Sequence, residues 1–367
     1  MNISPLRRVL ALPLLLLALA GSAHAVEVTD VLGRKVEVPA EPKRVVLGEG
    51  RLFFALALLD REAPFQRVVG WQNDMRLLDP HTYEVYAEQY PDIAKIPLIG
   101  QASEQSVSAE QILALKPDLA VFSIAGEGPT QHSPVADLLA AAGVPVLFID
   151  FRVHPIKNTR VSLETLGKLL GREREAQEYL SFYDRHLARV TDAVAGLPDA
   201  QRPKVFLELL AGVWQAPGHT TGKSGLGGVV EAVGGRNIAA GVVPGAIGDV
   251  SVEYVLSADP DVYIATGNRK PGVLLGAGVD EKTARDSLTK ITARPDFAPL
   301  RPIRDGQAHG LWHDFYNSPF NILAIESMAR WIHPERFADL DPQATQAEIN
   351  RFLAVGLDGH YWIDATP

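Results

Sequence analysis

The feature that most constrains the fold is an alternation of short β-branched segments with longer helical ones, on both sides of one long amphipathic stretch. The expected buried strands are residues 45–47, 68–70, 119–122, 146–150, 204–209 and 262–265. The expected helices are residues 52–59, 109–115, 136–142, 225–233, 252–256, 321–331 and 345–353. This alternation is typical of parallel sheets with helices on their faces. The sequence therefore predicts an α/β fold.

The amphipathic stretch lies near the middle of the chain. Its apolar residues recur in alternating steps of four and three from Ala176 to Leu197, with charged residues between them. This spacing predicts a helix of about six turns, which Pro198 and Pro203 are expected to end. The helix either packs within one large domain or joins two α/β lobes, and its central position favours the second alternative. The predicted fold is two Rossmann-like lobes joined by a single long α-helix. The expected divisions are a signal peptide, an N-terminal lobe, a connecting helix and a C-terminal lobe at residues 1–25, 26–170, 171–198 and 199–367.

The N-terminus has the pattern of an export signal. Arg7 and Arg8 precede an apolar run at residues 9–20, and residues 23–25 fit an A-x-A cleavage site. The run is shorter than the ~20 residues that a membrane-spanning helix needs. Since the chain has no cysteine, it has no site for a lipid anchor on that residue. The sequence predicts export by a cleaved signal peptide to the periplasm.

Composition narrows the classes of function. The 367 residues carry a formal net charge of −9, whereas nucleic-acid binders normally present a basic face. The absence of cysteine excludes thiol catalysis, cysteine-ligated zinc, iron–sulfur clusters and disulfides. We therefore expect a soluble protein that binds no nucleic acid.

No catalytic motif is complete. Residues 218–224 resemble a phosphate-binding loop, but three residues separate the glycines where that loop needs four. Ser224 does not complete a G-x-S-x-G motif, because Leu226 stands where the motif needs its second glycine. His309 and His313 have a spacing that could hold zinc on a helix, but a nearby glycine and proline favour a strand and loop. The chain is not expected to be an enzyme or to hold a cofactor or a resident metal. An exported hydrolase is the less favoured alternative; its acid–base groups would be Glu208, Asp249, His219 and His313.

A repeated motif links the two halves. Residues 108–121 align without a gap with residues 251–264, and five of the fourteen positions are identical. Each copy predicts a short helix with a serine N-cap and a Pro-Asp stop before a buried strand, and the first copy also fits a capping box. Glu110 and Glu253 fall in the first turns, where a carboxylate gains ~0.3–1 kcal/mol from the helix dipole. They either serve the helices alone or form an exposed pair of charges, one per lobe, for a partner surface.

Further short segments form a recognisable set together with this repeat. They are residues 28–39 (VTDVLGRKVEVP), 42–46, 97–100, 221–224, 234–238 and 317–319. Their order and spacing resemble the substrate-binding proteins of ABC importers for ferric siderophores, haem and cobalamin. The resemblance implies two lobes joined by one long helix, with the ligand in the cleft between them. It also implies that Glu110 and Glu253 dock onto arginines of a membrane permease, one lobe on each subunit.

The loops that follow the strands are the expected ligand site, because ligands of open α/β sheets bind beyond the carboxyl ends of the strands. These loops are rich in rings and arginines that suit a bulky anionic metal chelate. The candidate ligand-binding residues are Arg51, Trp71, Arg152, Trp214, His219, Arg269, Trp312, His313 and Tyr316.

The expected function is that of a periplasmic solute-binding component of an ABC importer. It would carry a ferric siderophore, as a monomer, to an inner-membrane permease with its ATPase subunits. Haem, cobalamin and oxyanions such as molybdate are the alternatives within the same family. Haem would need an axial ligand, for which the candidates are His81, Tyr83, Tyr86, His219 and His313.

Overall fold

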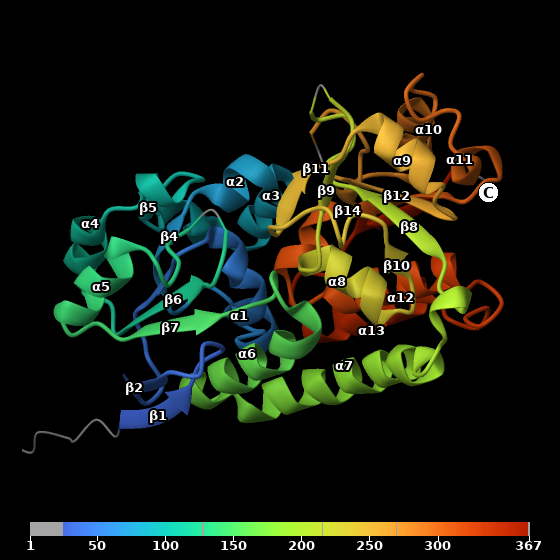
Figure 1. Cartoon of the computed structure of the whole chain (residues 1–367). Helices are drawn as coiled ribbons and strands as arrows, with labels where there is room; N and C mark the ends of the chain where they lie inside the picture. Colours follow the sequence, from blue (N-terminus) through green and yellow to red (C-terminus); the bar gives the residue numbers. More distant parts are fainter. Residues whose placement is uncertain (1–24, 127, 215, 269, 366–367) are drawn as a thin grey trace, which may run out of the picture.

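The computed structural model describes residues 25–126, 128–214, 216–268 and 270–365. Two α/β lobes, each built on a five-stranded sheet, lie side by side, and the long helix α7 (Glu173–Val194) runs beneath both (Figure 1). The predicted fold class is confirmed. The predicted signal peptide lies outside the described residues except for Ala25, the first residue of β1 (Ala25–Thr29), which pairs with β2 (Lys35–Pro39) in an antiparallel hairpin.

The N-terminal lobe holds a wholly parallel sheet. Its strands are β3 (Val45–Leu47), β4 (Val68–Gln72), β5 (Leu98–Gly100), β6 (Leu119–Ser123) and β7 (Val146–Ile149). Their order is β5-β4-β3-β6-β7, so the winding of the sheet reverses between β3 and β6. The longer helices are α1 (Phe53–Leu59), α2 (Asp74–Leu78), α3 (Pro80–Gln89), α4 (Ala109–Ala114), α5 (Pro134–Ala141) and α6 (Pro155–Leu170). All seven residues of α1 are apolar and buried, as expected for a helix enclosed by the core.

The C-terminal lobe is built on a mixed sheet. Its strands are β8 (Lys204–Glu208), β10 (Arg236–Asn237), β12 (Val262–Gly267), β14 (Ala308–Trp312) and β16 (Trp362–Asp364). The order is β10-β8-β12-β14-β16, and only the edge strand β16 runs antiparallel to its neighbour. The winding therefore reverses between β8 and β12.

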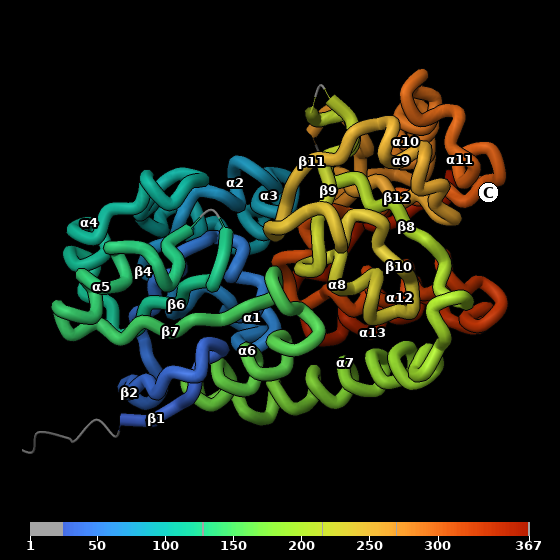
Figure 2. The backbone as a smooth tube through the Cα atoms, in the orientation of Figure 1, coloured from blue at the N-terminus to red at the C-terminus, as the bar shows by residue number. Residues whose placement is uncertain are grey.

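Helices and two small hairpins surround this second sheet. The helices are α8 (Gly225–Ala232), α9 (Val252–Ala258), α10 (Glu281–Thr292), α11 (Arg301–Arg304), α12 (Asn321–Ile332) and α13 (Pro342–Ile349). The hairpins pair β9 (His219–Thr221) with β11 (Ile247–Asp249), and β13 (Gly276–Ala277) with β15 (Gly359–His360). The β9–β11 hairpin faces the N-terminal lobe (Figure 2).

Helix α7 lies within the predicted connecting segment and contacts both lobes. Its buried face packs against α1 and α6 on one side and against α12 on the other. The Tyr179 hydroxyl donates to the Pro319 carbonyl at 2.7 Å, and the Tyr183 hydroxyl donates to Asn321 Oδ1 at 2.8 Å. The helix ends at Val194, before Gly196 with its positive φ of 74° and therefore ahead of the expected proline stop. No helix in the described part of the chain is both long and apolar enough to span a bilayer.

The two copies of the repeated motif have the same local structure. Ser108 Oγ accepts the Gln111 N–H at 3.2 Å at the start of α4, and Ser251 Oγ accepts the Tyr254 N–H at 3.1 Å at the start of α9. The reciprocal bond of the predicted capping box is not formed, because the Ser108 N–H donates to the Ile99 carbonyl at 3.1 Å.

The ends of the two copies also match. Lys116 and Asp259 occupy equivalent positions and both adopt left-handed backbone conformations, with φ of 48° and 46°. The aspartate that follows, Asp118 or Asp261, accepts backbone N–H groups at the start of the first sheet strand of its lobe, at 2.7–2.9 Å. The internal similarity in the sequence therefore corresponds to one structural unit used once in each lobe.

Candidate ligand-binding site

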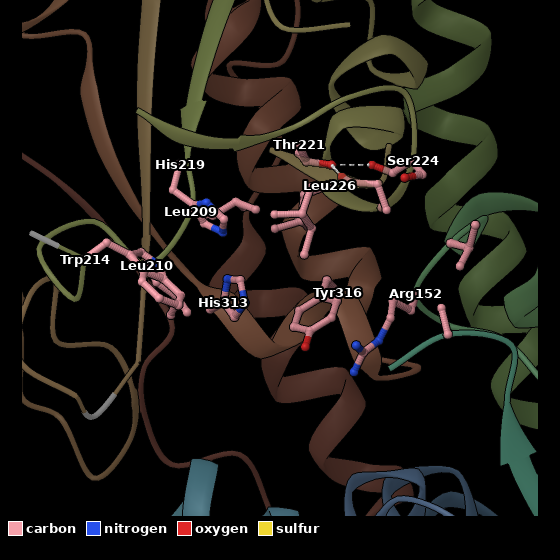
Figure 3. A pocket seen from close by; sticks show the side chains of 15 residues that line it. Arg152, Leu209, Leu210, Trp214, His219, Thr221, Ser224, Leu226, His313 and Tyr316 are labelled. Carbon is pink, nitrogen blue, oxygen red and sulfur yellow. Dashed lines mark hydrogen bonds between the residues drawn. The ribbon is translucent and has the colours of Figure 1, made fainter. Parts of the chain in front are cut away.

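The winding of both sheets reverses where the lobes face each other, and a cavity lies between the lobes. Such reversal points open a crevice at the carboxyl ends of the strands. The cavity has a volume of about 220 Å³. It is lined by Ala125, Arg152, Val153, Leu209, Leu210, Trp214, His219, Thr221, Ser224, Gly225, Leu226, Ala246, Ile247, His313 and Tyr316 (Figure 3). Of the eight predicted ligand residues that the structure describes, five are in this lining, and Arg51, Trp71 and Trp312 are not.

Arg152 is the cationic side chain that the N-terminal lobe contributes to the lining. Its loop, just after β7, is held by the buried Asp150, whose carboxylate accepts the N–H groups of Arg152, Val153 and His154 at 2.7–2.9 Å. The guanidinium lies 3.1 Å from Glu49 Oε2 and 4.6 Å from the centre of the Tyr316 ring. A carboxylate of its own lobe and a ring of the other lobe therefore fix the orientation of Arg152.

Arg51 occupies a different place from the one expected. Its side chain is 1% exposed and lies outside the cavity lining. Nε lies 2.9 Å from Asp74 Oδ2 in the same lobe, and one terminal nitrogen lies 2.7 Å from Asp314 Oδ1 in the other lobe. Arg51 therefore joins the two lobes through buried ion pairs. Its positive charge faces carboxylates of the protein and not the cavity.

A further carboxylate, Asp79, is buried near this ion-pair cluster. Burial and the charge of Asp314 raise the pKa of Asp79 to about 7. Burial also raises the pKa of Asp74 against the opposing effect of Arg51. Burial therefore favours the protonated form of both carboxyl groups.

Two histidines of the C-terminal lobe point into the cavity (Figure 3). His219 Nδ1 lies 2.9 Å from Asp249 Oδ1, and His313 Nδ1 lies 3.0 Å from Thr266 Oγ1. When Nδ1 of His219 carries the proton that Asp249 accepts, Nε2 presents a lone pair. The rings of Trp214 and Tyr316 lie beside these imidazoles, with centroid distances of 5.1 Å and 4.7 Å.

Two predicted tryptophans belong to the cores of the lobes. Trp71 on β4 packs edge-on against Phe53, and Trp312 on β14 packs edge-on against Phe315 and Tyr361. Both are 1% exposed, so neither reaches the cavity. Arg269 lies outside the described residues. Of the tryptophans expected at the ligand, only Trp214 lines the cavity, and it is 52% exposed.

Sequence reasoning missed most of the apolar lining. Leu209 and Leu210 follow β8 directly, Leu226 lies in α8, and Ile247 begins β11. Leu210 has a φ of 46°, which is rare for a branched side chain. Its N–H donates at 2.8 Å to Thr266 Oγ1, the same atom that contacts His313. Leu209 and Leu210 could have been predicted from their position directly after a strand, where ligands of such sheets bind.

Two of the groups considered for zinc or hydrolytic chemistry, His309 and Glu208, lie outside the cavity, whereas Asp249 is paired with His219. His309 stacks on Trp331 at 4.6 Å and bonds to Asp364 at 2.7 Å outside the cavity, so it does not pair with His313. Glu208 is buried and binds Arg294 through both carboxylate oxygens, at 2.5 Å and 3.0 Å. Within the described ranges, no three His, Asp or Glu side chains are grouped as a metal site.

Glu110 and Glu253 are exposed on α4 and α9, and neither forms an ion pair with another described residue. The Ser108 hydroxyl donates to Glu110 Oε2 at 2.9 Å. The pKa of Glu253 is lowered by its own backbone N–H and by the Ser251 hydroxyl. Both helices lie on the side of the molecule opposite α7, one on each lobe (Figure 1). The two carboxylates are thus available to a partner that spans both lobes.

Comparison with known proteins identifies the family. The periplasmic binding protein family matches residues 68–307, more than half of the chain. The chain belongs to this family. The resemblance noted in the sequence is thereby confirmed, and family membership implies a periplasmic location.

Individual relatives support this assignment. The vitamin B12-binding protein of Yersinia pestis (strain Pestoides F) is 31% identical over 182 residues, which are 49% of this chain and 59% of the relative, less than two thirds of its length. The structure of the TroA-like periplasmic binding protein FepB from Veillonella parvula is 25% identical, with a TM-score of 0.81 over 92% of this chain and 99% of that one. The Haemophilus influenzae protein MolA, solved with molybdate, shares the fold at 18% identity, with a TM-score of 0.67 over 91% of this periplasmic binding protein and 99% of MolA.

Proposed function

We propose that this periplasmic binding protein is the solute-binding component of an ABC importer, which holds a metal chelate in the cavity between its lobes and delivers it to a membrane permease. The observation that carries the proposal is the composition of the cavity wall. Arg152 comes from the N-terminal lobe, and His219, His313 and Tyr316 come from the C-terminal lobe. A ligand that touches both walls is held between the lobes, as a carried solute must be.

A ferric siderophore is the first candidate ligand, and the wall chemistry refines the expectation. Eight of the lining residues are Leu, Ile, Val, Ala or Trp, six of them in the C-terminal lobe, and Arg152 is already paired with Glu49. Apolar walls with a few polar groups favour a chelate that presents a hydrocarbon or ring surface. The volume of about 220 Å³ is below the ~300–1,000 Å³ of typical ligand pockets. A siderophore would therefore extend past the exposed Trp214 and Ile247 or open the lobes further.

Cobalamin is the second candidate. The observation that favours it is the 31% identity to the Yersinia vitamin B12-binding protein over 182 residues. A corrin ring would stack on Trp214 and Tyr316, which lie in the cavity lining.

A titration that follows tryptophan fluorescence tests the ligand. The probes are a ferric trihydroxamate, a ferric tricatecholate, ferric citrate, haem, cobalamin and molybdate. We expect saturable quenching by one chelate with micromolar or tighter affinity, about −8 kcal/mol or better. Trp214→Phe should remove most of the signal, whereas Trp71→Phe in the core of the N-terminal lobe should leave it. If none of these probes changed the tryptophan fluorescence of the folded protein, the chelate assignment would be wrong. A hydrolase that uses His219 and His313 would then be the remaining alternative.

We further propose that Glu110 and Glu253 dock onto arginines of the permease. Their exposure, equivalent positions and shared side of the molecule support this role. The double variant Glu110→Ala/Glu253→Ala should abolish uptake while binding by the purified protein survives. Glu62→Ala/Glu335→Ala, which also removes one exposed carboxylate from each lobe, should leave uptake unchanged. Loss of ligand binding in the first variant would contradict a docking role.

The maturation and assembly proposals are tested on the exported protein. Cleavage after Ala25 predicts that the periplasmic form begins at Val26, which N-terminal sequencing reads directly. A monomer is expected by light scattering, because a carrier that docks both lobes on a permease uses its own two carboxylates. An uncleaved N-terminus or a stable dimer would contradict these two expectations.

A further inference from the structure

Glu49 connects the ion-pair cluster between the lobes to the wall of the cavity. It follows β3, and its side chain is 1% exposed. Oε2 lies 3.1 Å from the Arg152 guanidinium, accepts the Asn317 side-chain amide at 3.0 Å, and lies 3.7 Å from Arg51. One buried carboxylate oxygen therefore contacts the cavity arginine, the buried arginine and the opposite lobe.

The loop after β6 is shaped around this carboxylate. A Cβ atom on Gly126 would lie 2.0 Å from Glu49 Oε1 and 2.9 Å from Cζ of Arg152. A Cβ atom on Gly128 would lie 2.8 Å from Glu49 Cγ. Gly126 also has a φ of 145°, which side chains rarely tolerate. The lack of a side chain at each of these glycines leaves room for the Glu49–Arg152 pair, so the pair has a built position.

The described charges around the pair leave no excess of positive charge, because two guanidinium groups face three carboxylates. Arg51 and Arg152 face the carboxylates of Glu49, Asp74 and Asp314. An anionic ligand that approached Arg152 would meet a guanidinium already bound to Glu49. If the ligand took Arg152 over, the buried Glu49 carboxylate would lose a counter-charge, which is costly in a desolvated place. A neutral ligand would leave the pair intact.

We propose that Glu49 determines the charge class of the ligand: by neutralising Arg152 from behind the cavity wall, it makes the cleft select chelates without net negative charge over anionic ones. This inference rests on the proposed function, because it concerns the same cavity. It narrows the ligand to a neutral, apolar-faced chelate, such as a ferric trihydroxamate.

The test compares the affinities of two ferric chelates that differ in charge, a neutral trihydroxamate and an anionic tricatecholate. The wild-type protein should bind the neutral chelate at least about tenfold more tightly, since close buried charge pairs are worth more than that factor. In Glu49→Gln, which keeps the shape and removes the charge, the ratio should shift at least about tenfold toward the anionic chelate. Glu335→Gln, the same charge change on an exposed residue of the other lobe, should leave the ratio unchanged.

The outcomes separate this inference from the proposed function. A wild-type preference for the anionic chelate would overturn the inference whether or not the variant folds. An unchanged ratio in folded Glu49→Gln, verified by circular dichroism, would also overturn it, while binding of either chelate would uphold the carrier function. In Glu49→Gln/Arg152→Gln the gain for the anionic chelate should disappear, because that gain requires the Arg152 guanidinium. Binding of neither chelate by the wild-type protein would overturn the siderophore assignment and this inference together.

Discussion

The two lobes share a repeated structural unit but contribute different walls to the cleft. The N-terminal wall presents Arg152 backed by Glu49, with Arg51 in buried ion pairs behind it. The C-terminal wall presents leucines, Ile247, Trp214 and two imidazoles, and Ile247 and Trp214 are 57% and 52% exposed. The N-terminal wall holds an arginine against a buried carboxylate, whereas the C-terminal wall is mainly apolar and more open to solvent.

This difference separates two kinds of contribution. Buried ion pairs are costly to break from one side, because the remaining charge stays desolvated. Exposed apolar side chains add little to folding but are ready to be covered by a ligand. Substitutions on the N-terminal wall should therefore change stability first, and substitutions on the C-terminal wall should change binding first.

The largest effect is expected at the junction of the lobes. Arg51→Ala would leave Asp74 and Asp314 without their shared counter-charge, so the free energy of unfolding should fall by about 3–5 kcal/mol. Urea unfolding followed by circular dichroism measures this loss. Arg304→Ala, on an exposed arginine of α11, is the matched control and should change stability by less than about 0.5 kcal/mol. If Arg51→Ala and Arg304→Ala lowered the free energy of unfolding equally, the N-terminal wall would have no special role in stability.

The pH dependence of stability tests the buried side of the cleft through Asp79. Its pKa is about 7 in the folded protein, against about 3.9 when unfolded, so the folded state binds more protons between these values. The free energy of unfolding should therefore fall as pH rises from about 4 to 7, by at most about 1.4 kcal/mol per pH unit, and level off above. Urea unfolding at several pH values should show this slope in the wild type, and Asp79→Asn should flatten it. Asp305→Asn, an exposed aspartate, should keep the wild-type slope. Identical slopes in all three proteins would show that Asp79 does not titrate here.

Trp214→Ala tests whether the C-terminal wall contributes to binding more than to stability. Removing a large ring at the ligand surface should weaken binding about tenfold, or about 1.4 kcal/mol, because aromatic anchors carry much of the binding energy. Calorimetric titration with the chelate that binds measures the loss. Thermal unfolding should show little change, since the side chain is half exposed. Leu138→Ala, an apolar residue of α5 that is 55% exposed and outside the cavity lining, should alter neither quantity. If Trp214→Ala lowered stability but left binding unchanged, Trp214 would be a packing residue and not a ligand contact.

The smallest effects concern what the lobes have in common. Ser108→Ala and Ser251→Ala remove equivalent N-caps, so each should cost about 1 kcal/mol of stability. Ser257→Ala, inside α9, should change stability by less than about 0.5 kcal/mol. Clearly unequal losses for the two N-caps would show that the repeated units are not equivalent in energy.

Much of the fold was accessible from local patterns. The strand expected at residues 45–47 is β3, and the amphipathic period placed the long helix within the segment that α7 occupies. The short strands β5 and β10 were not predicted, because their sequences, LIG and RN, contain no run of β-branched residues such as the VVL of β3. The helix expected at residues 345–353 begins earlier, at Pro342, and ends at Ile349. Helix boundaries depend on caps such as Asp341, which accepts the N–H groups of Gln343 and Ala344, and an apolar period does not reveal such caps.

The sequence predicted which loops form the candidate site but not which of their side chains line the cavity. The rule that ligands bind beyond parallel strands selected loops that hold Arg152, Trp214, His219, His313 and Tyr316. The same rule also selected Arg51, Trp71 and Trp312, which are buried. A tryptophan at the end of a strand faces either the core or the cleft, and the face depends on how helices cover the sheet. Composition alone does not distinguish the two faces.

The sequence by itself determined the class of fold, the long central helix, the paired motif of Glu110 and Glu253, and the family, because these depend on periodicity and on short local motifs. Only the tertiary structure decided which charges remain available in the cleft. Arg51 pairs with Asp74 and with Asp314 of the other lobe, and Arg152 pairs with Glu49; in each of these pairs the two residues are distant in the sequence. Charge compensation acts between neighbours in space, so the charge of the binding site is a property of the folded chain.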